Sequence, residues 1–387
     1  MKLKVLDLSR VLAGPVCSMM LGDMGADVIK VERPGDGDET RGWGPPFDHE
    51  GQSAYFLAVN RNKKSIAADL TNAEDRAIVL RLISGADAVL DNFLPGALER
   101  LGLDPQALLD QNPDLIWCTI SGFGPESTRP GYDFVIQAEC GWMAITGEPD
   151  RAPMKVGVAL ADVIAGKDAA IAILAVALER AGGQVPSDRR RIDISLADSA
   201  RAALVNVAQN VLVSGSDAKR WGNAHPNLVP YQLFEAADRP FVIAVGSDGQ
   251  WHACANALGL NDLAEDEALR TNAGRVKERA RLVSSVTRRV KEMNAQHWID
   301  RLQATRVPCG LVRNVAEVLE GVEADPRTGV SPSVPGSVRF PPPKLDEHGE
   351  SIRALGWRTF RSLQIPPGDY RIVSPSFARP PLLVLSR

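Results

Sequence analysis

The sequence predicts an α/β fold with an open, mostly parallel sheet and helices on both of its faces. Stretches with the apolar pattern of strands alternate with stretches of helical periodicity through the first half of the chain. The chain has 387 residues, of which 44% are hydrophobic and 24% charged, and this is enough for a large core and two domains. Because alternation of this kind joins parallel strands through crossover helices, we expect these strands to share one sheet.

The predicted elements follow one another in a regular order. The first strand is expected at residues 3–9, and Pro15 stands at the first position of the helix after it, where a missing N–H costs nothing. A strand at residues 27–33 completes a strand-helix-strand unit. Thr71 and Glu74 have the spacing of a capping box that opens the helix NAEDRAIVLRLISGA. Further strands are predicted in KSIAADL, DAVLDNF and LIWCTISGFG, and a helix in PGALERLGLDPQALLDQ.

The second half of the chain predicts a smaller α/β unit. An Ala-rich helix in AGKDAAIAILAVALERAGG is expected to end at Gly182. ISLADSARAALVNVAQNVLVSG predicts a strand and one long helix, after which the pattern changes over residues 214–230. FVIAVGS, a helix running to Asn261 and a charged helical stretch follow, and together they indicate the second unit.

Composition excludes several classes of function. The net charge is -4 and no block of Lys or Arg is interleaved with aromatics, so nucleic-acid binding is not expected. The five cysteines form no C-x-x-C pair and the five histidines lie far apart, so neither a disulfide framework nor a metal site is indicated. We expect no membrane span and no signal peptide, and a reducing cytoplasm as the location.

The residues that follow the strands are the first candidates for a ligand site. Ligands of open α/β sheets bind beyond the carboxyl ends of the strands. The turn RVLAGP has neither the G-x-G-x-x-G pattern nor a P-loop lysine, so a dinucleotide or ATP site is not supported. Six cations near strand ends would suit a phosphorylated ligand, although each alone is more simply a surface charge: Arg33, Arg41, Arg61, Lys63, Lys64 and Arg100.

Asp162 is the candidate for chemistry. It stands in MKVGVALADVIAGKDAA, among apolar and small residues and close to the start of the Ala-rich helix. Asp is also a preferred residue at a helix N-cap, where its negative charge is favourable, so the spacing alone leaves a plain capping role equally open.

A succession of motifs resembles one known family. The motifs are RVLAGPVCSMMLGDMGADVIKVERPGDGDETRGW, NRNKKSIAADL, DNFLPGALERLGL, ISGFG, ALADVIAGKDAA, GNAHPNLVPYQLF and RVPCGLVRNVAEVL. In this order they resemble the class III CoA-transferases, which include formyl-CoA and carnitine CoA-transferases and the related alpha-methylacyl-CoA racemases. The match runs from Leu3 to Val318. Beyond Glu320 it weakens: Asp346 stands where the family usually has Gly, and residues 358–387 match nothing in it.

The resemblance implies a Rossmann-like large domain with an open parallel sheet, a smaller α/β domain, and an interlocked homodimer. Residues 1–213 would form the large CoA-binding domain and residues 214–319 the small domain with its flanking linker. Residues 320–387 would return to the large domain and end in the atypical tail.

The resemblance also assigns roles to residues. Asp162 aligns with a nucleophilic aspartate that forms first an anhydride and then a thioester with CoA, so an acyl-CoA and a carboxylic acid are the implied substrates, with no permanently bound cofactor. Asp133 would orient the catalytic region, and capping its own helix DFVIQAECGWMA is the equal alternative. The implied CoA-binding residues are Leu12 and Ala13 along the pantetheine, Arg33 at the adenosine phosphate, Asp69, Leu70, Thr71, Asn92, Phe93 and Leu94 at the adenosine, Arg100 at the phosphates, and Tyr132 and Asp133 beside Asp162.

Two alternatives to CoA transfer remain at this level. A racemase or epimerase of this superfamily carries a His immediately before the position of Asp133, where this chain has Tyr132, whose phenol is a poor base at neutral pH. The other alternative is a non-catalytic CoA-binding protein. The segment GNAHPNLVPYQ, where some members have a glycine-rich closing loop, resembles members that use succinyl-CoA. Arg129, Arg220 and His225 are all open candidates for the cation that would bind a second carboxylate.

Overall fold

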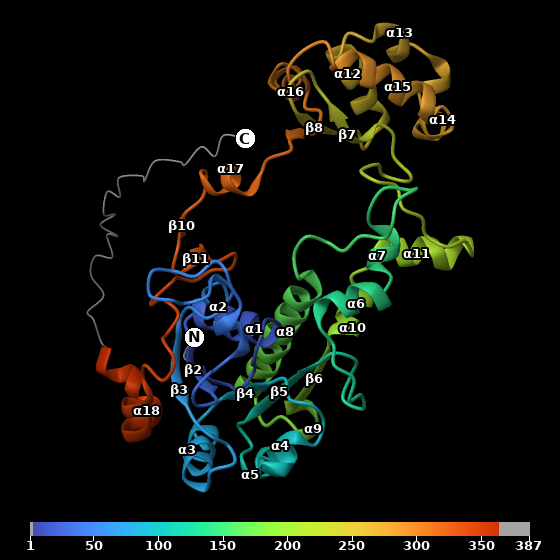
Figure 1. Ribbon diagram of the computed structural model, residues 1–387. Helices are drawn as coiled ribbons and strands as arrows, with labels where there is room; N and C mark the ends of the chain where they lie inside the picture. The colour runs from blue at the N-terminus through green and yellow to red at the C-terminus, as the bar shows by residue number, and fades with distance from the viewer. Residues whose placement is uncertain (1–2, 364–387) are drawn as a thin grey trace.

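A computed structural model describes residues 3–363 and contains a six-stranded, fully parallel sheet (Figure 1). The strand order is β3-β2-β1-β4-β5-β6, in which the direction of winding reverses between β1 and β4. The strands are β1 Lys4–Asp7, β2 Asp27–Glu32, β3 Lys63–Ala67, β4 Ala88–Asp91, β5 Ile116–Ser121 and β6 Arg191–Ser195. The predicted α/β fold with a parallel sheet is confirmed.

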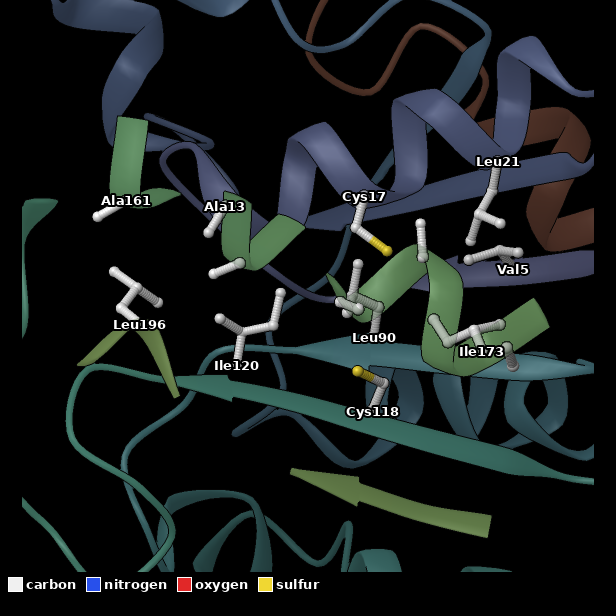
Figure 2. Packing of buried hydrophobic residues seen from close by; sticks show 14 of the residues in the cluster. Val5, Ala13, Cys17, Leu21, Leu90, Cys118, Ile120, Ala161, Ile173 and Leu196 are labelled. Atoms are coloured by element: carbon white, nitrogen blue, oxygen red, sulfur yellow. The ribbon is translucent and has the colours of Figure 1, made fainter. Parts of the chain in front are cut away.

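Helices cover both faces of this sheet because successive strand residues point to opposite sides. Val5 of β1 belongs to the core under α1 and α8, whereas Leu6 belongs to the core under α3. Figure 2 shows the first of these cores, with side chains of α1, α8 and the strands directed toward one another. The helices of this unit are α1 Ala13–Asp23, η1 Glu39–Gly42, α2 Ala54–Leu57, α3 Ala73–Ser84, α4 Ala97–Arg100, α5 Pro105–Gln111, α6 Asp133–Glu139, α7 Trp142–Ile145, α8 Leu160–Ala181, α9 Ser187–Arg190, α10 Leu196–Ala202 and α11 Val205–Ser214.

Helix α8 lies unusually close to α1 because of one glycine. A Cβ atom at Gly166 would be 2.5 Å from the carbonyl oxygen of Ala13 and 3.1 Å from Cβ of Val16. The close approach brings the first turn of α8 beside the turn between β1 and α1, so Gly166 sets the distance between two parts of the site described below.

We expect Gly166→Ala to lower the free energy of unfolding by about 2 kcal/mol, since the added methyl group meets backbone that cannot move aside. Thermal denaturation measures the change. Gly249→Ala is the matched control, because Gly249 also lies in a helix, α12, but a Cβ there meets nothing within 4 Å. Equal melting temperatures for the two variants would contradict the close packing.

Several predicted helix boundaries are wrong in detail. Helix α1 begins at Ala13, so Pro15 is its third residue rather than its first, still within the turn whose N–H groups have no partner. The N-cap of α3 is Asn72, whose side chain accepts hydrogen bonds from the N–H groups of Glu74 and Asp75, and the predicted capping box at Thr71 is absent.

Three predicted continuous helices are interrupted. The helix expected in PGALERLGLDPQALLDQ is α4 and α5, and the one expected in DFVIQAECGWMA is α6 and α7. The long helix expected after β6 is α10 and α11, separated at Ala203 and Leu204. The predicted end of α8 at Gly182 is confirmed by its C-cap.

The second α/β unit contains a three-stranded antiparallel sheet in the order β7-β8-β9. Its core is separate from the two cores of the large sheet and is built around Trp251, Trp298 and Phe241. The division at residues 213/214 and 319/320 stays a prediction. The elements are β7 Tyr231–Glu235, β8 Pro240–Ala244, α12 Asp248–Ala257, α13 Asn261–Ala264, η2 Glu267–Leu269, α14 Asn272–Lys277, α15 Arg279–Val290, α16 Ala295–Ala304 and β9 Cys309–Leu311.

Two connections join the units, one through the segment that follows α11 and one through α17, and Figure 1 shows them well apart. The second connection brings the chain back to the large sheet. There Arg61 donates hydrogen bonds to the carbonyl oxygens of Thr328 and Val330, and Arg339 donates to that of Gly22. The returning elements are α17 Val315–Leu319, β10 Ala324–Asp325, β11 Gly329–Val330, α18 Gly349–Leu355 and η3 Gly356–Leu363.

The returning chain covers the edge strand β3. The side chain of Asp346 accepts a hydrogen bond of 2.8 Å from the N–H of Ala67, and the N–H of His348 donates to the carbonyl oxygen of Ser65. Asp346 has a φ of 57°, a left-handed conformation that glycine and, among other residues, Asp and Asn adopt most readily. This backbone geometry accounts for Asp346 at a position where a Gly is usual. Of the atypical tail, residues 364–387 lie outside the described part of the chain.

Candidate active site

Two adjoining cavities of about 220 Å³ each lie at the carboxyl ends of the large sheet's strands. Arg10 and Phe93 line both, so they mark the place where the cavities meet. A larger hollow of about 770 Å³ lies beside α11 and residues 216–227, away from the strand ends, and none of the predicted CoA-binding residues lines it. The strand-end cavities are therefore the candidate site.

The first cavity is a mainly apolar slot with charged residues at its margin. Leu8, Val31 and Leu101 supply apolar surface, and Arg33 is about half exposed beside them. Of the predicted residues, Arg33, Asp69, Leu70, Thr71 and Phe93 line this slot. Such a slot suits a flat heterocycle with a phosphate near its rim.

The second cavity contains Asp162. Among the predicted residues it is lined by Leu12, Ala13, Asn92, Phe93, Leu94, Tyr132 and Asp162. Asn92 and Leu94, predicted beside the adenosine, thus lie with Asp162 rather than in the slot with Asp69. Arg100 and Asp133 line neither cavity.

Asp162 is the third residue of α8 and does not cap it. The N-cap is Ala159, so the plain capping role that the sequence left open is wrong. Within residues 3–363 no hydrogen bond to the Asp162 carboxylate is formed, although the side chain is partly buried. Burial, together with the negative charge of Asp133, raises the pKa of Asp162 to about 7. An unpaired carboxylate with a raised pKa at a cavity wall is available to react.

Asp133 fixes the start of α8. Its carboxylate accepts a hydrogen bond of 2.8 Å from the N–H of Ala161 and one of 2.6 Å from Nε2 of Gln137. Gln137 in turn accepts from the N–H of Val156. The N-cap of α6 is Tyr132, without a side-chain bond, so the alternative in which Asp133 caps its own helix is wrong. The orienting role of Asp133 stays a prediction that these bonds favour.

The turn between β1 and α1 is held in a strained shape. Val11 has a φ of 71°, which is costly for a β-branched residue. The amide of Asn92 accepts from the N–H of Arg10 and donates to its carbonyl oxygen, at 3.0 and 2.8 Å. The N–H of Val11 points to the Asp38 carboxylate. These bonds offset the strain and hold the wall next to Asp162, a role for Asn92 that the sequence did not indicate.

Four of the six cations predicted for a phosphorylated ligand are internal instead. Lys63 is fully buried and pairs with Asp7 at 3.1 Å, Arg61 pairs with Asp23, and Arg41 pairs with Glu32. Lys64 donates to the carbonyl oxygen of Thr359. Lys63 and Lys64 line neither cavity, and these internal bonds engage their ammonium groups. Arg33 is the one of the six that lines a cavity.

Two residues to which the sequence assigned no role lie at or near the site. Arg10 pairs with Glu39 at 2.6 Å and lies over the ring of Phe93. Its position directly after the first strand was the available signal. Tyr55 is near Asp162, because the negative charge of Asp162 adds to burial in raising the pKa of the Tyr55 phenol. No local pattern marks Tyr55.

In the described part of the chain no three side chains among His, Cys, Asp and Glu are grouped so that they could hold a metal ion. Among residues 3–363, none of the helices combines the length and the apolar character needed to cross a membrane.

Comparisons with known proteins agree with the cavity geometry. The family model described as CoA-transferase family III matches residues 2–348. A succinate–glutarate CoA-transferase of Agrobacterium fabrum is 39% identical over 381 residues, which cover 91% of this chain and 94% of that protein. A succinyl-CoA:glutarate CoA-transferase of Mus musculus is 40% identical, covering 90% and 84%.

Solved structures are similar over the same length. The crystal structure of a CAIB/BAIF family protein from Brucella suis has a TM-score of 0.80 and 44% identity, with 91% of this chain and 97% of that chain covered. A hypothetical protein from Mycobacterium tuberculosis has a TM-score of 0.78 and 29% identity, with coverages of 90% and 97%.

Proposed function

Since the chain belongs to CoA-transferase family III and is a CoA-transferase, we propose that it moves CoA from succinyl-CoA to a carboxylic acid through Asp162. The observation that carries this proposal is the Asp162 carboxylate, unpaired and with a raised pKa, in a cavity that opens into the apolar slot. The names of the similar glutarate transferases support succinyl-CoA as the donor and a dicarboxylate as the acceptor.

The reaction would proceed by repeated exchange at three carbonyl carbons, those of the donor, Asp162 and the acceptor. An Asp162 oxygen attacks the donor thioester carbonyl, the C–S bond breaks, CoA leaves as a thiolate, and a mixed anhydride of Asp162 and succinate remains. The thiolate attacks the aspartyl carbonyl and displaces succinate, which leaves an aspartyl-CoA thioester. An acceptor carboxylate then attacks that thioester and displaces the CoA thiolate, which forms an anhydride of Asp162 and the acceptor. The thiolate attacks the acceptor's carbonyl in this anhydride. The new acyl-CoA leaves and the Asp162 carboxylate is restored.

The cavities give a direction for bound CoA. The adenine would lie in the slot lined by Leu70, with a phosphate beside Arg33. The pantetheine would pass Arg10 and Phe93, where the cavities meet, and run along Leu12 and Ala13 to Asp162. Arg100 has no place on this path, since it lines neither cavity.

A donor and acceptor matrix tests the proposed function. Succinyl-CoA, acetyl-CoA and formyl-CoA would each be incubated with a panel of mono- and dicarboxylates, and the CoA products identified by mass. We expect transfer from succinyl-CoA to a dicarboxylate. The racemase alternative predicts exchange of the alpha proton of a 2-methylacyl-CoA in D2O without any acceptor. Proton exchange at a catalytic rate, with no transfer of CoA to any acid, would contradict the transferase mechanism.

The interlocked homodimer also enters here as a proposal. Helix α11 has no buried residue, and its Val205, Leu212 and Val213 are 69 to 78% exposed. A ten-residue helix is marginal without packing, so a second copy of the chain covering this apolar side would stabilise it. The hollow beside α11, with Trp221 and Tyr231 in its wall, extends the same surface.

We therefore expect light scattering to give twice the chain mass of 41.7 kDa at micromolar concentration. Leu212→Glu should lower the fraction of dimer that forms when the unfolded chain is refolded, because it places a charge in the covered surface. The matched control is Leu178→Glu, since Leu178 is equally exposed, at 77%, but lies on α8. A wild-type mass of 41.7 kDa would exclude the dimer.

A further inference from the structure

Arg129 is a cation in a position to bind a second group of the substrate. It lies between β5 and α6 and lines the cavity that contains Asp162 and Tyr132. Its guanidinium lies over the ring of Phe123, 4.1 Å from the centroid, and pairs with Glu139 at 2.5 Å. The side chain is 57% exposed, so the guanidinium is open to solvent on the remaining side.

The backbone around Arg129 is held close to the end of β5. A Cβ atom at Gly131 would lie 2.4 Å from Cα of Gly122, so these two glycines let the two backbone segments touch. The N–H of Arg129 also donates to the hydroxyl of Ser127. Tyr132, the N-cap of α6, follows Gly131 directly. The position of Arg129 is therefore coupled to that of Asp133, and through Asp133 to the start of α8.

The structure separates the three cations that the sequence left open for a second carboxylate. His225 lines the other hollow, beside α11. Arg220 donates to the carbonyl oxygens of Glu148, Pro149 and Arg151, so its guanidinium is engaged by backbone. Arg129 alone of the three shares a cavity with Asp162.

Arg10 is the other guanidinium in this cavity, and its position differs from that of Arg129. It stands where the two cavities meet, beside the proposed path of the pantetheine, and it pairs with Glu39. A group at that junction is reached by the CoA part of every acyl-CoA. A group at Arg129, in the cavity with Asp162 but absent from the slot, is placed for the acyl part.

We propose that Arg129 binds the second carboxylate of dicarboxylyl-CoA donors and of dicarboxylic acid acceptors, and so selects dicarboxylates over monocarboxylates. This inference rests on the proposed transfer through Asp162. Guanidinium groups bind carboxylates through two parallel hydrogen bonds, and the contact with Phe123 leaves their edge free for this. Donor and acceptor react at the same aspartate, so one arginine serves both halves of the reaction.

Glu139 has a defined part in this proposal. In the free enzyme it holds Arg129 through a solvent-exposed ion pair, which is a weak interaction. The substrate carboxylate replaces Glu139 as the partner of Arg129. The pair therefore keeps the cation oriented while the cavity is empty and lowers the affinity for dicarboxylates slightly.

The test compares donors in Arg129→Met, a variant that keeps an apolar stem over Phe123. We expect kcat/KM for succinyl-CoA to fall about 10- to 100-fold, in line with the loss of a charge-assisted pair. The kcat/KM for acetyl-CoA and the dissociation constant of free CoA should each change by less than about 3-fold, because Arg129 lies outside the proposed path of CoA. Arg129→Lys should be intermediate, because an ammonium keeps the charge without the bidentate geometry.

Glu139→Gln is the matched variant on the partner side. It should raise kcat/KM for succinyl-CoA and leave that for acetyl-CoA unchanged, an effect that general damage to the site does not produce. If Arg129→Met lowered kcat/KM for both donors and the affinity for free CoA by equal factors, the inference would be overturned and Arg129 would be a CoA contact. An unchanged ratio of kcat/KM for succinyl-CoA to kcat/KM for acetyl-CoA would overturn it too. Wild-type enzyme that transfers CoA from no donor at all would instead refute the proposed function.

Discussion

CoA transfer should stop in the Asp162→Asn variant, with kcat falling by at least about 10³-fold, the scale of loss when a covalent nucleophile is removed. An amide of the same shape cannot form the anhydride, whereas the CoA contacts in both cavities remain. The affinity for free CoA, measured by calorimetry, should stay within about 3-fold of wild type. In wild-type enzyme incubated with an acyl-CoA, hydroxylamine or borohydride should label Asp162 in the mass spectrum.

Asp168→Asn is the control, because Asp168 is a second carboxylate on α8 that bonds to the hydroxyl of Ser199 and faces neither cavity.

The stability of Asp162→Asn is informative as well. The folded protein raises the pKa of Asp162 from 3.8 to about 7, so the ionised carboxylate destabilises the fold progressively as pH rises through this range. The Asn variant should therefore melt higher than wild type at pH 8 and equally at pH 4. If Asp162→Asn still transferred CoA, another residue would have to be the nucleophile.

The rate should depend on pH through a single ionisation near 7. Only the carboxylate form of Asp162 is a nucleophile, so kcat/KM should approach a tenfold fall for each pH unit well below its pKa, and should fall about 50-fold between pH 7 and pH 5. Initial rates with succinyl-CoA over this range give the profile. A flat profile would mean that the ionisation of Asp162 does not limit the reaction.

Asp133→Asn provides the control for the pH profile. The Asn oxygen can still accept from the N–H of Ala161, but the negative charge is gone. Because that charge raises the pKa of Asp162, its removal should move the midpoint of the profile to lower pH. Burial is the larger cause of the raised pKa and remains, so the midpoint should stay above the value of an ordinary aspartate. A midpoint that moves upward would contradict this account.

The parallel sheet and the place of the candidate site could be predicted because both follow from local pattern and parallel topology. The order of the strands was not predicted. The residues after β1, β2, β3 and β4 meet at one edge of the sheet, and Asp162 stands in the first turn of α8. The resemblance to a family named Asp162 as the proposed nucleophile, and the structure shows Tyr132 and Leu12 in the wall of the same cavity.

What the sequence could not supply depends on contacts between distant residues. Lys63 is a buried partner of Asp7 rather than a phosphate ligand, and nothing within several residues of Lys63 indicates that. Asn92 supports the backbone of Arg10, 82 positions away. Tyr55 approaches Asp162 only through the fold. The breaks between α6 and α7 and between α10 and α11 likewise lie in stretches whose periodicity continues across them.

The cover that residues 346–348 place on β3 has a kinetic consequence for the proposed dimer. The chain leaves the large sheet after α11, passes through the small unit and is fastened back by Asp346 and His348, which makes each subunit a closed loop. Two such loops linked through one another form a mechanical bond. They separate only when one fastening opens, however weak the surface between them is. The lifetime of the pair would then be set by detachment of the whole returning segment, held at Arg61 and Arg339 as well as at β3, and dilution alone would not produce single subunits.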